Sequence, residues 1–140
     1  MTLSKKLQVF LLYARSDKKI VRRLYLRLVR EGANAWLDEE KIVPGQDWES
    51  EIHKAIYRSD IVIVCLSRQF TKQGGYRHEE LKIAIEKGAS LPQGETFIIP
   101  VRLERCDTPE SLGRWQRVDL FEADGNKKLL STLESKCNFD

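Results

Sequence analysis

The most constraining feature of the sequence is the segment DIVIVCLS, residues 60–67, whose six central residues, 61–66, are all apolar. A strand with one face in water alternates apolar and polar side chains, whereas a strand covered on both faces is apolar throughout. Strands covered in this way occur in parallel sheets that helices flank on both sides. The segment therefore indicates an α/β fold.

The rest of the chain alternates in the way that such a fold requires. Short apolar runs at residues 7–13, 34–38, 96–103 and 117–121 predict four further strands. Between them, apolar residues at helical spacing predict helices, the first with Ile20, Val21, Leu24 and Leu28 on its inner face. We therefore predict a flavodoxin-like, three-layer α/β/α domain with a five-stranded parallel sheet of order 2-1-3-4-5. A length of 140 residues suits a single domain.

Local signals place the ends of these elements. Ser16 or Asp17 is predicted to cap the first helix, and Gly32 to end it. Pro44 and Gly45 predict a tight turn in which Gly45 takes a positive φ, and Asp47 is predicted to cap the next helix. Residues 76–87 and 125–137 are predicted to form the last two helices.

Sites in doubly wound sheets lie beyond the carboxyl ends of the strands. Four segments are expected to meet there: residues 13–17, 38–48, 67–80 and 102–114. Within the third segment, Glu80 lies at the border of the inner helix face, Tyr76 lies one turn earlier, and Glu79 points further outward. From position alone, Glu80 is either an acidic residue that favours a helix N-terminus or a catalytic group. Trp48, which follows a polar turn, either packs on the core or stacks on a ligand.

Several kinds of site are excluded or disfavoured. No GxGxxG follows the first strand, and the chain contains no GxxxxGK[ST]. A phosphoacceptor receiver needs an aspartate where the third strand ends, and this chain has Ser67 there. The histidines, His53 and His78, are predicted to be surface helix residues. The cysteines, Cys65, Cys106 and Cys137, fit neither a disulfide framework nor a zinc site, and Cys65 is expected in the core.

Charge and hydropathy narrow the range of partners. The net charge is +3, and along the whole chain basic residues are interspersed with acidic ones, so we expect no nucleic-acid binding through this domain. The longest apolar run is far shorter than a membrane span, so we expect no membrane partner. The unpaired cysteines and the lack of a secretory segment favour a cytoplasmic location.

Taken in order, several segments of the chain resemble a Toll/interleukin-receptor (TIR) domain. These are VFLLYARSD, WLDEEKIVPGQDWESEI, SDIVIVCLS and YRHEELKIAI. The later segment FIIPVRLERCDTPESLGRWQRVDLF resembles the prokaryotic branch of that family. The resemblance extends over residues 7–135. Two positions depart from the family pattern, because Leu12 stands where a serine is frequent and Tyr76 where a tryptophan is frequent.

The resemblance implies an activity and a site. Many prokaryotic, plant and axonal TIR domains are NAD⁺ glycohydrolases, whose catalytic glutamate follows an aromatic residue by four positions; that pattern falls on Tyr76 and Glu80. The substrate-binding residues that we expect are Trp48, Tyr76, Tyr13, Ala14, Arg15, Asp38, Lys41 and Ser67. The family's mobile BB loop corresponds to residues 38–47, including Ile42, Val43, Pro44, Gly45, Gln46 and Asp47.

The resemblance thus predicts an enzyme that cleaves the nicotinamide–ribose bond of NAD⁺, giving nicotinamide and either ADP-ribose or a cyclic ADP-ribose isomer, in prokaryotic immune signalling and antiphage defence. No metal or further cofactor is expected, and the partners expected are NAD⁺ and other TIR protomers in a homo-oligomer or filament. Residues 1–140 are predicted to be one TIR domain, a module of a longer protein. The alternative is a non-catalytic TIR module that acts by self-association. A third hypothesis is a receiver-like or nucleotide-sensing flavodoxin-like domain.

Overall fold

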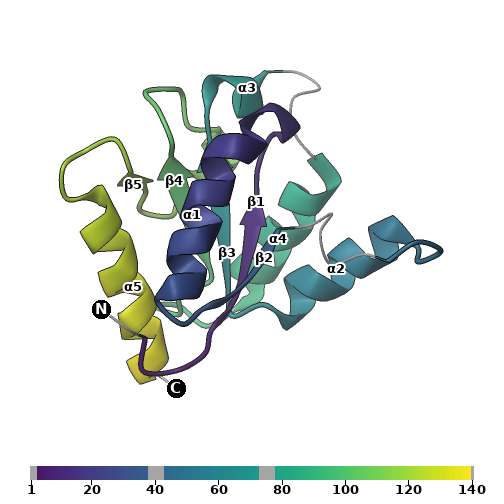
Figure 1. Ribbon diagram of the computed structural model, residues 1–140, viewed down its shortest axis with the longest axis horizontal. Helices are drawn as coiled ribbons and strands as arrows, with labels where there is room; N and C mark the ends of the chain where they lie inside the picture. The colour runs from purple at the N-terminus through teal and green to yellow at the C-terminus, as the bar shows by residue number, and fades with distance from the viewer. Residues whose placement is uncertain (1–2, 38–42, 73–77, 140) are drawn as a thin grey trace.

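The computed structural model describes residues 3–37, 43–72 and 78–139 (Figure 1). Its sheet has five parallel strands in the order β2-β1-β3-β4-β5, as predicted. The strands are β1 (Gln8–Leu12), β2 (Asn34–Leu37), β3 (Ile61–Leu66), β4 (Ile98–Arg102) and β5 (Val118–Asp119). The helices are α1 (Lys18–Arg30), α2 (Trp48–Arg58), α3 (Arg68–Thr71), α4 (His78–Ser90) and α5 (Gly125–Phe139).

Helices cover both faces of the sheet. Residues of α1 and α5 form one apolar cluster with the odd-numbered side chains of β1 and β3. Residues of α2, α3 and α4 form a second cluster with the even-numbered side chains of the same strands. The strands therefore lie between two helical layers (Figure 1), and the predicted three-layer architecture is confirmed.

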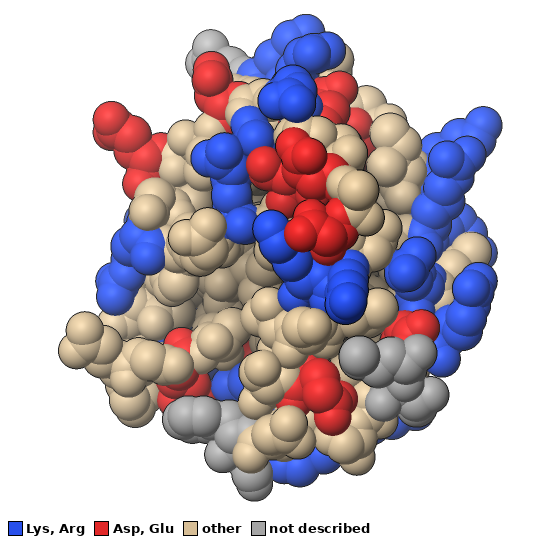
Figure 2. Space-filling view, turned by 90° about the vertical axis from the view of Figure 1, so that its left-hand side faces the viewer, with Lys and Arg blue, Asp and Glu red and all other residues tan. Residues whose placement is uncertain are grey.

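Charge is distributed unevenly over the outer layer. Helix α1, KKIVRRLYLRLVR, has two lysines and four arginines and no acidic residue. Figure 2 views the molecule from the side of α5, with α1 at the right, and shows Lys and Arg side chains gathered along that right-hand edge. The interspersion of basic and acidic residues, which holds for the chain as a whole, therefore does not hold for this helix.

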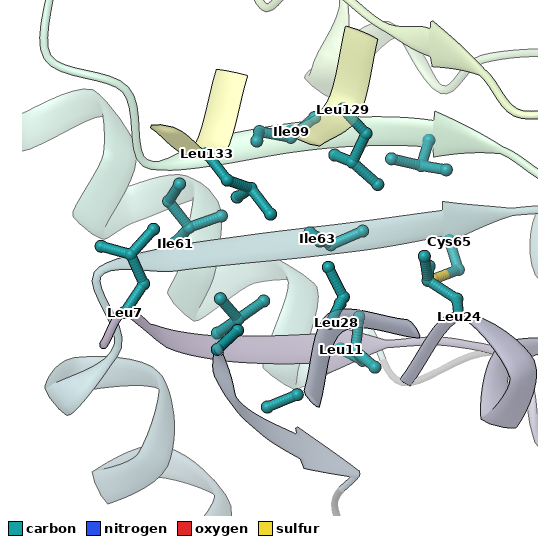
Figure 3. Packing of buried hydrophobic residues seen from close by; sticks show 14 of the residues in the cluster. Leu7, Leu11, Leu24, Leu28, Ile61, Ile63, Cys65, Ile99, Leu129 and Leu133 are labelled. Carbon is teal, nitrogen blue, oxygen red and sulfur yellow. The ribbon is translucent and has the colours of Figure 1, made fainter. Parts of the chain in front are cut away.

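Strand β3 has β1 on one side and β4 on the other, and all six of its residues are buried. Its odd-numbered side chains meet α1 and α5, and Figure 3 shows Leu28 of α1 and Leu133 of α5 on this side of the sheet with Ile63. Burying an apolar side chain stabilises a fold by about 1.5–3 kcal/mol. The unbroken apolar run thus has the two-sided cover that the sequence predicts, and Cys65 lies in the core.

Pro100 occupies the one kind of strand position in β4 that tolerates it. The β4 residues that bond to β3 are the odd-numbered ones, since Val62 N donates to Phe97 O (2.7 Å) and Leu103 N donates to Leu66 O (2.8 Å). Hydrogen-bonding groups alternate sides along a strand, so the missing N–H of Pro100 faces away from β3. The proline removes no hydrogen bond from the central ladder.

Three local predictions differ from the structure. Strand β5 spans two residues rather than the predicted five. A one-turn helix, α3, with Ser67 as its N-cap, was not predicted from the sequence. Ile20 is 52% exposed, because the buried stripe of α1 is formed by Val21, Leu24 and Leu28, and Ile20 flanks that stripe.

The structure contains the predicted end of α1, the predicted turn before α2 and the predicted cap of α2. Gly32 follows α1 with φ +98°, and Gly45 has φ +93°. Gln46 N donates to Val43 O (3.2 Å), which closes the predicted turn around Pro44 and Gly45. Asp47 caps α2 by accepting from Ser50 N (3.2 Å). None of the helices in the described part of the chain is both long and apolar enough to span a bilayer.

Candidate functional site

The end of β1 supplies one side of the predicted site. Tyr13 and Ala14 follow the strand and are 3% and 1% exposed, so their side chains lie in the core. Arg15, which begins a short 3-10 helix, is exposed. Of these three predicted substrate-binding residues, Arg15 is therefore the one whose side chain reaches the surface.

A buried hydrogen bond joins this segment to the end of β3. The hydroxyl of Ser67 donates to a carboxylate oxygen of Asp17, and both residues are buried. The same hydroxyl accepts from Phe70 N (3.0 Å), which caps α3. Asp17 stands at the N-cap position of α1 but makes no side-chain cap there, contrary to the prediction, because its carboxylate is directed to Ser67. The hydroxyl of Ser67, predicted to bind substrate, is engaged within the protein.

Cys65, on β3, is two residues before Ser67 in the sequence and lies near this hydrogen bond. Burial raises the pKa of the Cys65 thiol well above its usual range, and the negative charge of Asp17 raises it further. Reactive cysteines have lowered pKa values and are partly exposed. Cys65 is therefore an inert core thiol.

The predicted catalytic glutamate lies in the first turn of α4. Glu80 is 6% exposed, whereas its neighbour Glu79 is exposed and points outward as predicted. Leu81 and Ala84 anchor the same helix in the core. A carboxylate near a helix N-terminus is stabilised by the helix dipole. The sequence thus places a charged group in a buried position near the carboxyl edge of the sheet.

Helix α2 presents the predicted aromatic. Trp48 is the first residue of α2 and is 37% exposed. Helices α2 and α4 pack beside one another on the same face of the sheet. Trp48 and Glu80 therefore lie in the first turns of two neighbouring helices.

The described part of the BB loop, residues 43–47, is exposed. The side chain of Gln46 holds it, with Oε1 accepting from Val43 N (2.8 Å) and Nε2 donating to Glu51 (3.2 Å). Four predicted site residues lie outside the described residues: Asp38, Lys41, Ile42 and Tyr76.

The β4–β5 end of the same edge is held by an ion-pair network. Arg102 donates to both carboxylate oxygens of Asp119 (2.7 and 2.8 Å) and to Cys106 O (2.9 Å). Arg117 adds a third contact to Asp119 (3.2 Å). The hydrogen bond from Arg102 holds the pKa of Asp119 below its usual range. These contacts fix the course of the chain after β4.

Two features of this edge were missed by sequence reasoning. The Asp17–Ser67 bond joins residues 50 positions apart, and the Arg102–Asp119 pair joins residues 17 apart. Each residue ends or follows a strand that neighbours its partner's strand, so the predicted strand order could have suggested both pairs. No group of three or more metal-ligating side chains occurs among the described residues.

The fold is that of a flavodoxin-like α/β domain. Buried polar groups lie at the carboxyl edge of its sheet, where the central strands end. The family model of the TIR domain matches residues 9–133. The chain therefore belongs to the TIR domain family, as the sequence resemblance indicated.

Other known proteins are similar to this chain, and the solved structures among them share its fold. An uncharacterized protein, y4cD, of Sinorhizobium fredii is 29% identical over 110 residues, which is 77% of this chain and 17% of that protein. The chain thus matches about a sixth of that relative's length. The TIR domain of the Toll-related receptor TRR-2 of Hydra magnipapillata has a TM-score of 0.72 at 23% identity, covering 91% of this chain and 98% of that one. The TIR domains of the activated Roq1 resistosome have a TM-score of 0.60 at 20% identity, covering 96% and 86%.

Proposed function

We propose that this TIR domain is an NAD⁺ glycohydrolase of the prokaryotic NAD-cleaving branch, acting in the cytoplasm in immune signalling. The observation that carries the proposal is the burial of Glu80 in the first turn of α4. In a site shielded from water, a carboxylate interacts more strongly with a positive charge that develops on a substrate than it would in solvent. A buried glutamate at the position where NAD-cleaving TIR domains have their catalytic carboxylate supports an active site.

One carboxylate suffices for this reaction. Glycosidases that act on neutral sugars use a second carboxyl group to protonate the leaving oxygen. The nicotinamide of NAD⁺ is a cationic pyridinium, so its ring nitrogen takes the electron pair of the broken C–N bond and leaves as a neutral molecule without a general acid. The ribose then carries positive charge, which the carboxylate of Glu80 stabilises as it develops.

Water completes the reaction. A water molecule attacks the anomeric carbon of the ribose, and the proton that it loses passes to Glu80 or to solvent, giving ADP-ribose. If a nucleophilic atom of the substrate itself attacks in place of water and loses its proton, the product is a cyclic ADP-ribose isomer, which contains one water molecule fewer than ADP-ribose. Trp48 can stack on a flat ring of the substrate, and the exposed Arg15 can pair with its diphosphate.

A second candidate function is a non-catalytic module that acts by self-association. The observation that favours it is the exposure of aromatic and aliphatic side chains in α2 and the loop before it: Val43 is 58% exposed, Trp48 37% and Tyr57 62%. Exposed apolar side chains of this kind can contribute to protein contacts where they form a continuous patch. The two candidates are compatible when assembly completes the site, but only the first requires NAD⁺ cleavage.

The test is to incubate the purified protein with NAD⁺ over a broad range of protein concentration and to follow nicotinamide and ADP-ribose by chromatography. Glu80→Gln should lower turnover by at least about 100-fold, the size of effect seen when one transition-state contact is removed. Glu79→Gln is the matched control, since Glu79 is in the same turn and exposed, and it should retain turnover. Wild-type turnover in Glu80→Gln would refute the catalytic assignment, and no cleavage by the wild type at any concentration would favour the second candidate.

A further inference from the structure

A groove lies between α1 and the ends of β4 and β5, away from the carboxylate site. Its volume is about 430 Å³. Its floor is apolar, formed by the buried Leu24 and the half-buried Leu103 and Leu120. Asn126, in the first turn of α5, lines the far side. Pockets of this size that combine an apolar floor with polar walls are typical of binding sites.

Three arginines form the near wall. Arg23, Arg27 and Arg30 all line the groove, and they follow one another at spacings of four and three residues, so they lie in a row on one face of α1. Seven residues of helix extend about 10 Å, which is the length of this row. The guanidinium groups are therefore spaced by about one helical turn along an apolar floor.

The helix dipole favours Arg27 and Arg30 in the last turn of α1, but it gives no reason for Arg23 in the same row. Arg23 has like-charged neighbours one turn away on either side, Lys19 and Arg27, and such pairs destabilise a helix. Within residues 3–37, 43–72 and 78–139, none of Lys19, Arg23, Arg27 and Arg30 forms an ion pair. An anionic partner would relieve a repulsion that the free domain leaves in place.

Apolar exposure indicates which anionic partner fits. Ile20, at one end of the groove, is 52% exposed, and Leu26 and Val29 on the outer side of α1 are 49% and 44% exposed. A phosphate backbone gains little from such contacts, and a flat membrane surface does not reach a recessed floor. A second copy that docked with the same face would bring the basic α1 against another basic α1. A peptide with acidic and apolar residues matches both the wall and the floor.

We propose that the groove between α1 and the first turn of α5 docks an amphipathic helix of a partner segment, whose acidic residues recur about one turn apart beside an apolar stripe. The acidic residues pair with Arg23, Arg27 and Arg30, since carboxylates accept two hydrogen bonds from a guanidinium. The apolar stripe covers Ile20 and the leucine floor. This is a helix-in-groove interaction with a charged wall that sets orientation.

The probe is a synthetic helical peptide of about four turns with a stripe of glutamates beside a stripe of leucines, labelled for fluorescence anisotropy. A peptide of the same composition, shuffled so that neither stripe forms, is its control. Vesicles containing phosphatidylserine and a single-stranded RNA test the other anionic surfaces. We expect the striped peptide to bind at least about tenfold more tightly than the shuffled one, with an affinity that falls as salt is added.

Two matched variants locate the binding site. Arg23→Gln and Lys19→Gln each remove one positive charge from α1, and each residue has two basic neighbours one turn away, but only Arg23 lines the groove. Both should raise the Tm of the free protein slightly, by about 1 °C, because each relieves like-charge repulsion. Arg23→Gln should weaken binding of the striped peptide by about tenfold, and Lys19→Gln by less than about twofold.

A slight rise in Tm in both variants, with weaker binding of the striped peptide in Arg23→Gln alone, supports the proposal, because a purely structural arginine would lower the Tm when replaced. Equal weakening by both variants, or equal affinity for the shuffled peptide, would overturn it in favour of general attraction between charges. No binding of the striped peptide would overturn it as well. If Arg23→Gln weakens the binding of vesicles or of RNA but not that of the striped peptide, the groove binds a different partner and the proposal is overturned.

Discussion

The carboxyl edge of the sheet holds its acidic side chains in two different ways. In the β1–β3 half, Asp17 is 8% exposed and accepts from the hydroxyl of Ser67, and it forms no ion pair with any residue that the structure describes. In the β4–β5 half, Asp119 accepts from Arg102 and Arg117 and is neutralised. A carboxylate neutralised by a guanidinium cannot also stabilise a cation on a substrate. The β1–β3 half therefore holds Asp17 through a hydroxyl group, whereas the β4–β5 half uses paired charges to fix the chain.

The largest effect on this comparison is expected from Ser67→Ala. The change removes the donor to the buried Asp17 and the acceptor for Phe70 N, so it leaves two buried polar groups without these partners. An unsatisfied buried group costs about 1–3 kcal/mol, and more when it is charged. We expect the free energy of unfolding to fall by about 3 kcal/mol, measured by urea unfolding.

Thr71→Ala is the control for Ser67→Ala, because the hydroxyl of Thr71 donates to a backbone carbonyl in the same one-turn helix but at its more exposed end. Its free energy of unfolding should change by no more than about 0.5 kcal/mol. If the free energy of unfolding falls by a similar amount in the two variants, the Asp17–Ser67 hydrogen bond does not stabilise the fold more than an exposed one does. The two halves of the edge would then not differ in the way described.

A smaller fall in the free energy of unfolding, one that depends on pH, is expected from Arg102→Gln. Arg102 and Asp119 are 13% and 21% exposed, and the change leaves Asp119 without its two strongest hydrogen bonds. Hydrogen bonds to charged groups contribute about 1.5–3 kcal/mol, so we expect a loss of about 2 kcal/mol at pH 7.

The sign of the pH dependence follows from the direction of the pKa shift. The pKa of Asp119 is lowered in the folded protein, chiefly by the hydrogen bond from Arg102. Its stabilising contribution is therefore complete above the unfolded pKa, about 4, and is lost as the pH falls through the lower folded value. The difference in unfolding free energy between wild type and variant should be constant above about pH 5 and should shrink below about pH 4. A difference that does not change with pH would assign the loss to packing of Arg102 on Phe121, whose ring centroid is 5.3 Å from the guanidinium carbon.

Sequence patterns predicted the fold well because the fold depends on local periodicity. The all-apolar β3, the turn at Gly45 and the cap at Asp47 were each specified by adjacent residues, and the strand order followed from the alternation of strands and helices along the chain. The errors concern residues whose environment is set by distant parts of the chain. Asp17 was predicted to cap its own helix, but a serine 50 residues later takes its carboxylate.

The predicted site residues show the same limit. Tyr13 and Ala14 were assigned to the substrate from the family resemblance, which does not indicate where their side chains lie, and both side chains are in the two apolar clusters. The burial of Glu80 and the exposure of Glu79, by contrast, follow from helical spacing, which the sequence contains. Which face of an element is buried can thus be predicted from local spacing, whereas a hydrogen bond between two elements can be suggested only once the order of the strands is known.

The smallest expected effect comes from Trp48→Ala, which tests whether the candidate site extends from the β1–β3 half to α2. Trp48 is 37% exposed at the start of α2, so truncation should change the Tm little, and its main effect should be on substrate binding. Loss of a stacked ring weakens binding by about 0.5–1.5 kcal/mol, which corresponds to a rise in KM for NAD⁺ of about 2–10-fold. Tyr57→Ala is the control, since Tyr57 is an exposed aromatic near the other end of the same helix and should leave KM unchanged. A marked drop in the Tm of Trp48→Ala with KM unchanged would place the ring in the packing of α2, and the substrate site would then end at the β1–β3 half.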